Sequence, residues 1–350
     1  MKKIIIFALL LLNILAFSSL LTQEPVVKER KTNFFREYDN YLDNSQKQIL
    51  IPGLKEGYIP QGLAYIEDKE IFVISYYHGY LPSVLTFIDG KTSQLIKSFA
   101  VLNADGSPYT GHAGGVAVSK NNLWISSGSQ IHRMSLKKVY AAQDSQKVKI
   151  DEAYKVLTRA SFMTFHEDCL WVGEFFRKNN YPTHKTHHVK MEDGSTNYAW
   201  IEVYEIDPQT DEILNIQIEG SQKKITPDII LSIPDIVQGI SFSETGEILL
   251  SLSYGRTNDS TIQVYENVIK QEAKTSVEIN DSRVPLWILN QENRTCELKA
   301  LPMSEGIFVQ ADSVYVLYES AAKKYKDTTK YATDYIWSVS YKDLCDLNDN

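Results

Sequence analysis

The sequence predicts an all-β fold in which a small antiparallel sheet is repeated several times, and two observations lead to this prediction. A phrase of strand, polar turn and second strand recurs five times along the 350 residues. The composition includes 21 Tyr and 13 Phe, and aromatic rings favour strands because they pack well on a pleated, half-buried surface. With 43% hydrophobic residues, the chain can bury a large core.

The five copies share one pattern: a small residue opens an apolar strand, polar residues form a turn, and a second strand returns. The first strands are Gln61–Ile66, Gly114–Ser119, Ala160–Phe165, Gln238–Ser243 and Glu305–Gln310. The second strands are Glu70–Tyr77, Leu123–Ser127, Cys169–Glu174, Glu247–Ser253 and Ser313–Glu319. The small residues at the fixed position are Gly62, Gly115, Ser161, Gly239 and Gly306. Such self-similarity indicates one repeat architecture.

Further strands between the copies extend the unit to four antiparallel strands. They cover Ser83–Asp89, Gln94–Leu102, Ile131–Leu136, Trp200–Asp207, Ile213–Ile218, Thr261–Glu266 and Tyr335–Tyr341. Repeated four-stranded sheets are typical of β-propeller blades, which bury both faces only by packing around a common axis. We therefore predict a β-propeller of five blades. Six blades are the alternative, because Asp228–Ile233 and Pro285–Leu289 are unassigned strand candidates.

The ends of the chain suggest how the ring closes. The fifth copy lacks an outer strand, and the short strand Gln46–Leu54 lies just ahead of the first copy. We expect this strand to pair in the last blade, so that both ends of the propeller domain, residues 45–350, meet in one sheet.

The N-terminal residues indicate export. Lys2 and Lys3 precede an almost wholly apolar run, Ile4–Leu21, and Ala16-Phe17-Ser18 offers a small-x-small cleavage site. We interpret residues 1–22 as a signal peptide; an uncleaved membrane anchor is the alternative, because the run is nearly long enough to span a bilayer. Residues 23–44 are polar and lack a period, so a tether is expected there. Either way, the folded part would be secreted, periplasmic or on the cell surface.

Charge and cysteine content narrow the class of protein. The formal net charge of −8 argues against a nucleic-acid partner and against a general anionic membrane surface. The three cysteines are Cys169, Cys296 and Cys345. Their odd number and long spacing do not form a disulfide framework or a metal-type pair, so we prefer three unpaired side chains, with one bridge as the alternative.

Four phrases carry a resemblance to known proteins. Ile59–Tyr65, Ser75–Tyr77, Tyr109–Val118 and Leu123–Ser126 resemble secreted bacterial β-propeller proteins of unassigned function, over about Ile51–Tyr341. At the level of fold, the chain is similar to the YVTN and gluconolactonase-like propellers. It departs from the calcium-dependent lactonases, because the stretch Gln238–Gly246 lacks the aspartate and asparagine expected as metal ligands.

Blade topology places the candidate site on one face of the ring. Residues just before a first strand and just after a second strand share this face, which we call the top face, around the central channel. Candidates before first strands are Gln61, His112, Gln238 and Glu305; candidates after second strands are Tyr76, Tyr77, His78, Ser127, Glu174, Tyr254, Arg256 and Glu319. The longest insertions, Phe176–Tyr198 and Ala321–Asp334, also follow second strands and are expected to wall this face.

The candidates mix carboxylates, amides, phenols and an imidazole, which suits several chemistries. His112 could serve as a general base or a ligand, and Glu305 with Glu174 could act as acid and base or bind Ca²⁺. Arg256 could recognise an anionic group. The alternative is that these polar residues only line the channel and that the glycines are needed because the inner strands crowd there. His184, His187 and His188 lack the context of a metal motif and are read as incidental.

Three functions remain open at this stage. The first is binding of a small-molecule, glycan or peptide ligand at the top face by an extracytoplasmic monomer. The second is a hydrolase or lyase that uses His112 with Glu305 or Glu174, with Ca²⁺ as a possible cofactor. The third is a membrane-tethered interaction scaffold that uses the outer blade edges.

Overall fold

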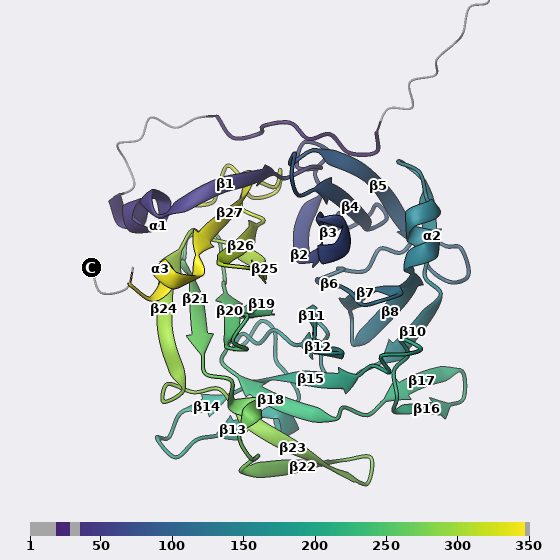
Figure 1. Ribbon diagram of the computed structural model, residues 1–350, viewed down its shortest axis with the longest axis vertical. Helices are drawn as coiled ribbons and strands as arrows, with labels where there is room; N and C mark the ends of the chain where they lie inside the picture. The colour runs from purple at the N-terminus through teal and green to yellow at the C-terminus, as the bar shows by residue number, and fades with distance from the viewer. Residues whose placement is uncertain (1–18, 29–35, 347–350) are drawn as a thin grey trace, which may run out of the picture.

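The structure is a computed structural model that describes residues 19–28 and 36–346. It is a β-propeller of five blades whose innermost strands neighbour one another in a closed ring (Figure 1). The predicted fold class and blade number are therefore confirmed, and the sixth blade is not needed to account for any described strand.

The first two blades run from the axis outward as follows. Blade 1 contains β2 (Ile59–Ile66), β3 (Ile71–Tyr77), β4 (Val84–Asp89), β5 (Leu95–Leu102) and β9 (Lys147–Lys149). Blade 2 contains β6 (Gly115–Val118), β7 (Asn122–Ser127), β8 (Gln130–Ser135), β10 (Glu152–Lys155), β17 (Gln222–Ile225) and β16 (Ile216–Glu219).

The other three blades complete the ring. Blade 3 contains β11 (Phe162–His166), β12 (Cys169–Gly173), β15 (Ala199–Glu205), β18 (Ile229–Ile233), β23 (Ser282–Ile288) and β22 (Thr275–Ile279). Blade 4 contains β19 (Val237–Phe242), β20 (Ile248–Leu252), β21 (Ser260–Tyr265) and β24 (Arg294–Ala300). Blade 5 contains β25 (Ser304–Gln310), β26 (Ser313–Tyr318), β27 (Tyr335–Ser340) and β1 (Ser45–Leu50).

Short elements lie outside the blade sheets. They are the ribbon β13 (Val189–Lys190) with β14 (Thr196–Asn197), the α-helices α1 (Asp39–Asp43), α2 (Leu136–Ala141) and α3 (Tyr341–Asp346), and the 3₁₀ turns η1 (Arg36–Tyr38), η2 (Glu67–Lys69), η3 (Lys185–His187) and η4 (Val268–Lys270). Among the described residues, no helix has the length and apolar character needed to cross a membrane.

The outer edges explain the unassigned strands. In blades 2, 3 and 4, the segment between the third and fourth strands reaches back and adds a parallel strand to the preceding blade: β9 on β5, β17 on β10, and β23 on β18. Asp228–Ile233 thus supplies the fourth strand of blade 3, and Pro285–Leu289 belongs to its added edge strand. The prediction that Ile213–Ile218 continues blade 3 was wrong, because β16 pairs with β17 at the edge of blade 2.

The hydrophobic core is divided into layers between neighbouring blades. One cluster joins blades 1 and 2 through Val73 and Val116, and another joins blades 3 and 4 through Ile201 and Ile240. Similar layers lie between blades 2 and 3, between blades 4 and 5, and between blades 5 and 1. Each blade therefore buries both faces against its neighbours, which explains why the strands carry apolar residues on both sides.

Glycines let the inner strands pack tightly at the axis. A Cβ atom on Gly62 would lie 2.5 Å from the Val116 backbone nitrogen of the next blade, and one on Gly115 would lie 2.3 Å from that of Met163. Gly306 would bring a Cβ within 2.6 Å of the backbone nitrogen of Leu63. The axial cavity at this level holds only about 10 Å³, which is barely room for one water molecule. The fixed glycines of the repeats are thus explained by close packing.

The N-terminal strand closes the ring as predicted. Strand β1 pairs antiparallel with β27, so blade 5 combines the beginning and the end of the propeller domain (Figure 1). Because the first and last strands of the domain share one sheet, the ring cannot open there without breaking the hydrogen bonds between β1 and β27.

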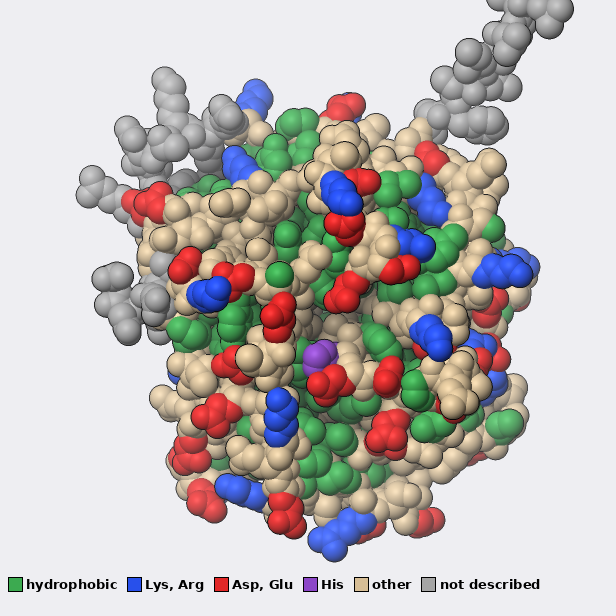
Figure 2. All heavy atoms as spheres, viewed as in Figure 1, with side chains coloured by type: hydrophobic (Ala, Val, Ile, Leu, Met, Phe, Trp, Pro, Cys, Tyr) green, Lys and Arg blue, Asp and Glu red, His purple; other side chains and the backbone are tan. Residues whose placement is uncertain are grey.

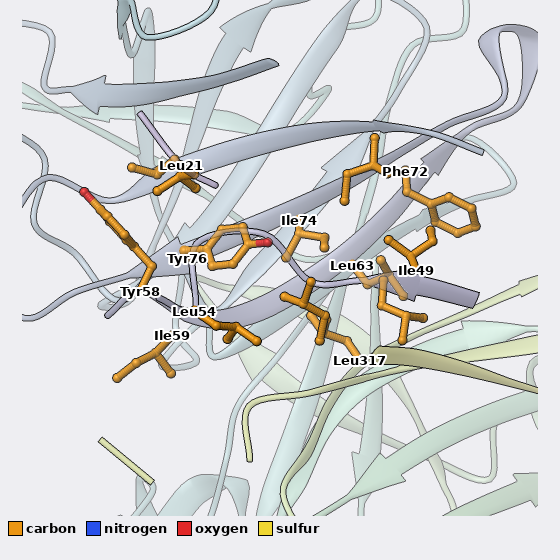
Figure 3. Packing of buried hydrophobic residues seen from close by; sticks show 14 of the residues in the cluster. Leu21, Ile49, Leu54, Tyr58, Ile59, Leu63, Phe72, Ile74, Tyr76 and Leu317 are labelled. Atoms are coloured by element: carbon orange, nitrogen blue, oxygen red, sulfur yellow. The ribbon is translucent and has the colours of Figure 1, made fainter. Parts of the chain in front are cut away.

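The described part of the expected tether, in contrast, packs against the propeller. Leu21 is fully buried beside Leu54 and Tyr58 (Figure 3). Gln23 donates to the carbonyl oxygens of Leu50 and Ser93, each at 2.8 Å. Residues 36–43 form η1 and α1, whose Tyr38 and Tyr41 are also buried. The tether prediction is therefore wrong for residues 23–28 and 36–44, because their few apolar side chains find partners between blades. The first 18 residues of the predicted signal peptide or anchor lie outside the described residues.

One disulfide is present, contrary to the preferred reading of three unpaired cysteines. Cys296 of β24 is bonded to Cys345 of α3, with a Cα–Cα distance of 5.3 Å. This bond holds the C-terminal helix on blade 4. Cys169 is a free, half-buried thiol.

Figure 2 shows one face of the molecule with acidic, basic and hydrophobic side chains interspersed. On the part of that face drawn in colour, lysines and arginines do not form a broad patch.

Candidate functional site

Three inner strands are distorted where they carry polar side chains toward the channel. The antiparallel register shifts between Pro60 and Leu63 in β2, between Val237 and Gly239 in β19, and between Ser304 and Ile307 in β25. These irregularities contain Gln61, Gln238 and Glu305, three of the predicted site residues. Bulges re-aim side chains and are common next to active sites, so the distortion distinguishes these residues from the regular strand positions around them.

A pair of carboxyl groups lies at the centre of this arrangement. Glu305 and Glu319, which directly follows β26, are hydrogen-bonded to each other through their side chains. Gln61 Nε2 lies 3.2 Å from Glu319 Oε2, and Gln238 Nε2 lies 3.2 Å from Glu305 Oε1. Amides from blades 1 and 4 thus flank a carboxyl pair from blade 5.

Burial of Glu305 and partial burial of Glu319 change the protonation of the pair. Glu305 is only 4% exposed. Burial, together with the charge and hydrogen bond of Glu319, raises the pKa of Glu305 well above its ordinary value. Burial also raises the pKa of Glu319 to about 7, although Gln61, Lys324 and Arg256 oppose this shift. Two adjacent carboxyls cannot both ionise easily, so the pair is expected to hold one proton between them at neutral pH.

Aromatic side chains surround the carboxyl pair. The Tyr77 and Tyr325 hydroxyl oxygens are 3.2 Å apart, and the charges of Glu305 and Glu319 act on both phenols. The His112 ring stacks on Tyr77, with centroids 3.9 Å apart and an interplanar angle of 26°. Tyr325 lies in the predicted insertion Ala321–Asp334, so this insertion does contribute to the site.

His112 is held as a neutral ring. Its backbone N–H donates to Ser127 Oγ at 2.9 Å, which fixes the loop ahead of β6. Solvent reaches the ring, but the surrounding walls of the channel and the nearby Lys324 charge lower the pKa of the imidazole to about 4. At neutral pH, His112 can therefore stack and accept a hydrogen bond, and it carries no positive charge.

Two cations complete the group. The Arg256 guanidinium carbon and Lys324 Nζ lie 5.0 Å and 5.2 Å from the centroid of the Tyr325 ring. Arg256 Nη1 donates to Thr328 Oγ1 at 3.0 Å. We call the whole group the channel-mouth site; its members are Gln61, Tyr77, His112, Gln238, Arg256, Glu305, Glu319, Lys324 and Tyr325.

Glu174 belongs to a different cluster. Its Oε1 lies 2.6 Å from His187 Nδ1 and also accepts from the Trp200 backbone N–H at 3.2 Å. Both Glu174 and His187 are buried, and the His187 ring stacks on Trp200 at 4.2 Å between centroids. Glu174 thus anchors the blade 3 insertion, and no described contact joins it to Glu305. The predicted acid–base partner of Glu305 is replaced by Glu319.

The remaining predicted residues divide between the wall and the core. Tyr254 accepts a hydrogen bond from Asn180 at 3.0 Å and lies under the Arg177 guanidinium, so it contacts the blade 3 insertion. His78 packs against Tyr58 and Tyr80, outside the channel-mouth site. Tyr76 is fully buried inside blade 1 (Figure 3). Its assignment to ligand binding was wrong, because successive side chains of a strand point to opposite faces.

The donor set does not fit the proposed calcium ion. Among residues 19–28 and 36–346, no three His, Cys, Asp or Glu side chains gather closely enough to hold a metal. The Glu305–Glu319 pair is instead accompanied by the charges of Lys324 and Arg256, which would oppose a hard cation.

One cavity lies away from these groups. It measures about 400 Å³ at the outer edge of blades 2 and 3, between Asn215, Asp228 and Arg283. Its lining includes neither a carboxyl pair nor a buried histidine.

The sequence predicted seven of the nine members of the channel-mouth site and missed Tyr325 and Lys324; it also missed His187 as the partner of Glu174. Tyr325 and Lys324 lie in an insertion that blade topology predicted to be on the top face. Their approximate position could therefore be predicted from the sequence, but the direction of their side chains could not. His187 appeared only as part of an incidental histidine cluster.

Comparison with known proteins identifies no family for the chain. No protein-family model and no curated protein sequence match the chain. A structure of aldose sugar dehydrogenase from Streptomyces coelicolor, in its PQQ-bound form, is 12% identical, covers 85% of this chain and 97% of that chain, and has a TM-score of 0.45. A gluconolactonase from Xanthomonas campestris is 11% identical, covers 85% and 89%, and has a TM-score of 0.38.

A glutaminyl cyclase from Myxococcus xanthus is 8% identical, covers 85% of this chain and 92% of that chain, and has a TM-score of 0.38. From its own strand order, the chain is a five-bladed β-propeller.

Proposed function

We propose that the protein binds a small, hydroxyl-rich ligand, of about the size of a monosaccharide, at the channel-mouth site. The observation that carries this proposal is the pairing of buried Glu305 with half-buried Glu319, flanked by amides from two other blades. Burying ionisable groups costs free energy, and a propeller needs no carboxyls at its axis to close. Perturbed titratable groups of this kind concentrate at functional sites.

The chemistry of the site suits hydroxyl groups. A carboxyl pair with one proton can both donate and accept, the amides of Gln61 and Gln238 do the same, and Tyr77 and Tyr325 add phenols and ring faces. Because the axial cavity holds only about 10 Å³, the ligand would rest on the mouth and would not thread the ring. The insertions that carry Tyr325 and Arg177 provide the surrounding wall.

We also propose that the protein works outside the cytoplasm. Support comes from the basic and apolar N-terminal residues and from the Cys296–Cys345 disulfide, which is a bond typical of oxidising compartments. Leu21 packs in the fold only three residues after the Ala16-Phe17-Ser18 cleavage site. Mass spectrometry of protein recovered from an exporting host should show a chain that begins at Ser19 with one disulfide. Recovery of an uncleaved chain with three reactive thiols would contradict this location.

Thermal melts of the complete chain test the binding proposal. The probes are methyl β-D-glucoside, D-glucosamine, D-glucuronate and glycerol, each titrated to millimolar concentration. Binding to the native state raises the melting temperature in a concentration-dependent manner. We expect at least one sugar probe to stabilise the wild type and to lose this effect in Glu305→Gln. The control Glu278→Gln changes an exposed carboxylate on β22 and should keep it. Absence of a shift with every probe, or an equal shift in Glu305→Gln, would refute the proposal.

Acid–base catalysis at the same site is the second candidate, and the shared proton of Glu305 and Glu319 favours it. One carboxylate could accept a proton while the other carboxyl donates one. Ester, lactone, phosphoester and glycoside substrates should then be turned over by the wild type and not by Glu305→Gln or Glu319→Gln. Because the pKa of His112 is lowered to about 4, we expect His112→Ala to retain turnover; its complete loss would restore His112 as the base.

A further inference from the structure

Lys324 and Arg256 are the two cationic side chains of the channel-mouth site. Both lie over the ring of Tyr325, and both lie near enough to Glu319 for their charges to act on it. Within the part of the chain that the structure describes, neither forms an ion pair, unlike Lys330, which pairs with Glu37. Both residues are exposed, in a protein whose net charge is −8.

The charge balance of the site has a definite sign. The carboxyl pair carries about one negative charge when it shares a proton, and the His112 ring is neutral. Lys324 and Arg256 carry two positive charges. The mouth is therefore left with an excess of one positive charge, which a single anionic group on a ligand would neutralise.

We propose that the ligand is a hydroxylated carboxylic acid of the sugar-acid type, whose carboxylate contacts Lys324 and Arg256 while its hydroxyl groups contact Gln61, Gln238 and the Glu305–Glu319 pair. This inference rests on the proposed function and names the class of ligand for the same site. Arg presents a planar fork that matches a carboxylate, and Lys adds a point charge.

Binding of such a ligand is coupled to the proton of the carboxyl pair. The groups that face the pair are Lys324, Arg256, Tyr77 and Tyr325, with Gln61 and Gln238 as neutral partners. While the proton is present, the pair donates to the ligand. When Glu319 releases its proton, a negative charge of the pair faces the incoming carboxylate. Dissociation of the proton near pH 7 should therefore weaken binding about tenfold between pH 6 and pH 8.

Four probes with one ring and different charges test this assignment by calorimetric titration of the complete chain. They are D-glucuronate, methyl β-D-glucoside, D-glucosamine and D-glucose 6-phosphate. We expect D-glucuronate to bind at least tenfold more tightly than the neutral and cationic sugars, and more tightly than the phosphate, whose second negative charge exceeds the excess of the site. Titrations at pH 8 in buffers of different ionisation enthalpy should show uptake of nearly one proton.

Variants separate the cations from the rest of the site. Lys324→Gln and Arg256→Gln should each weaken D-glucuronate binding about tenfold or more, and weaken it more than they weaken methyl β-D-glucoside binding. Lys323→Gln, which removes the exposed neighbouring lysine, is the matched control and should bind as the wild type does. Glu319→Gln should bind D-glucuronate with an affinity that no longer changes between pH 6 and pH 8.

Each other outcome has a distinct meaning. Equal binding of the neutral sugar and D-glucuronate, preference for D-glucosamine or the phosphate, or an unchanged preference in both Lys324→Gln and Arg256→Gln would overturn the sugar-acid assignment and leave the proposed binding function standing. Failure of all four probes to bind would overturn both.

Discussion

Glu319 occupies an environment that favours its protonated form, and this has a consequence for stability. Burial raises the pKa of its carboxyl to about 7, above an unfolded value near 4.3. A carboxyl whose pKa is raised by folding binds its proton more tightly in the native state than in the unfolded state. Its contribution is therefore fully present below about pH 4 and is lost as the pH rises through about 7.

We predict that Glu319→Gln removes this loss. Relative to the wild type, the variant should gain about 2 kcal/mol in free energy of unfolding between pH 5 and pH 8, because glutamine has no proton to release. Urea unfolding of both proteins at the two pH values measures the difference. Stability profiles that remain parallel across this range would show that the carboxyl pair is solvated and titrates normally.

At this scale, the sequence located chain positions better than side-chain directions. Repeat topology correctly placed Gln61, Gln238 and Glu305 at the channel, because these residues occupy equivalent positions in their blades. It could not separate Tyr76 from Tyr77: both end the same strand, and only the register decides which one faces the mouth. The link between Glu305 and Glu319 was also hidden, because pairing depends on rotamers that no sequence period encodes.

Inner strands impose their own constraint at the scale of the element. Their glycines are required by the neighbouring backbone, as shown by the 2.3 Å separation that a Cβ on Gly115 would have from Met163 N. Backbone atoms cannot move aside as a flexible side chain can. The small residue that marks each repeat is thus a packing requirement and also brings the polar strand ends close together.

We predict that Gly115→Ala costs about 3 kcal/mol or more of stability, as overpacking against backbone does. Gly220→Ala is the control: Gly220 has a left-handed φ of 60° but no atom within 4 Å of its missing Cβ. That substitution should cost only about 1 kcal/mol. Urea unfolding separates the two, and equal losses would mean that backbone conformation, and not the approach of blade 3, explains the conserved spacing of small residues along the repeats.

Edge strands were the least predictable elements. The pattern of Ile213–Ile218 is that of a strand, but only its end lies in one, β16 (Ile216–Glu219), whose partner is β17 of the blade 2 sheet. An alternating sequence specifies that a strand forms and leaves its partner open, since every blade offers a similar outer edge. The backward connections between third and fourth strands, which resolve the assignment, are a property of the three-dimensional path.

The Cys296–Cys345 bond gives the C-terminal helix α3 a fixed position, and we predict a measurable cost of its removal. It spans a sequence separation of 49 residues, for which loop-closure entropy gives a loss of about 2–4 kcal/mol. Cys345→Ser should show this loss in urea unfolding, and addition of a reductant should destabilise the wild type only. Cys169→Ser, at the free half-buried thiol, should change stability by about 1 kcal/mol or less. A wild type insensitive to reductant would contradict the bond.

At the scale of the whole molecule, two N-terminal segments fasten the ring. Closure by β1 was predictable, because the fifth blade lacked a strand and one apolar strand stood ahead of the first repeat. Packing of residues 19–28 was not, because the segment has no period: it is held by single contacts such as those of the Val26 and Val27 backbone N–H groups with Asp334 Oδ2, each at 2.9 Å. The segment spans the boundary between blades 1 and 5, so it reinforces the joint at which the ring would open.

Leu21 tests whether that reinforcement is substantial. Its side chain is fully buried in the layer between blades 5 and 1, so Leu21→Ala should cost about 2–4 kcal/mol of stability through lost burial and the cavity left behind. Leu157→Ala, at a side chain that is 45% exposed, is the matched control and should cost about 0.5 kcal/mol or less. Urea unfolding measures both, and limited proteolysis should cut Leu21→Ala faster than the control near residues 19–28. If the two variants were equally stable, residues 19–28 would add nothing to the stability of the ring, and its closure would depend on β1 alone.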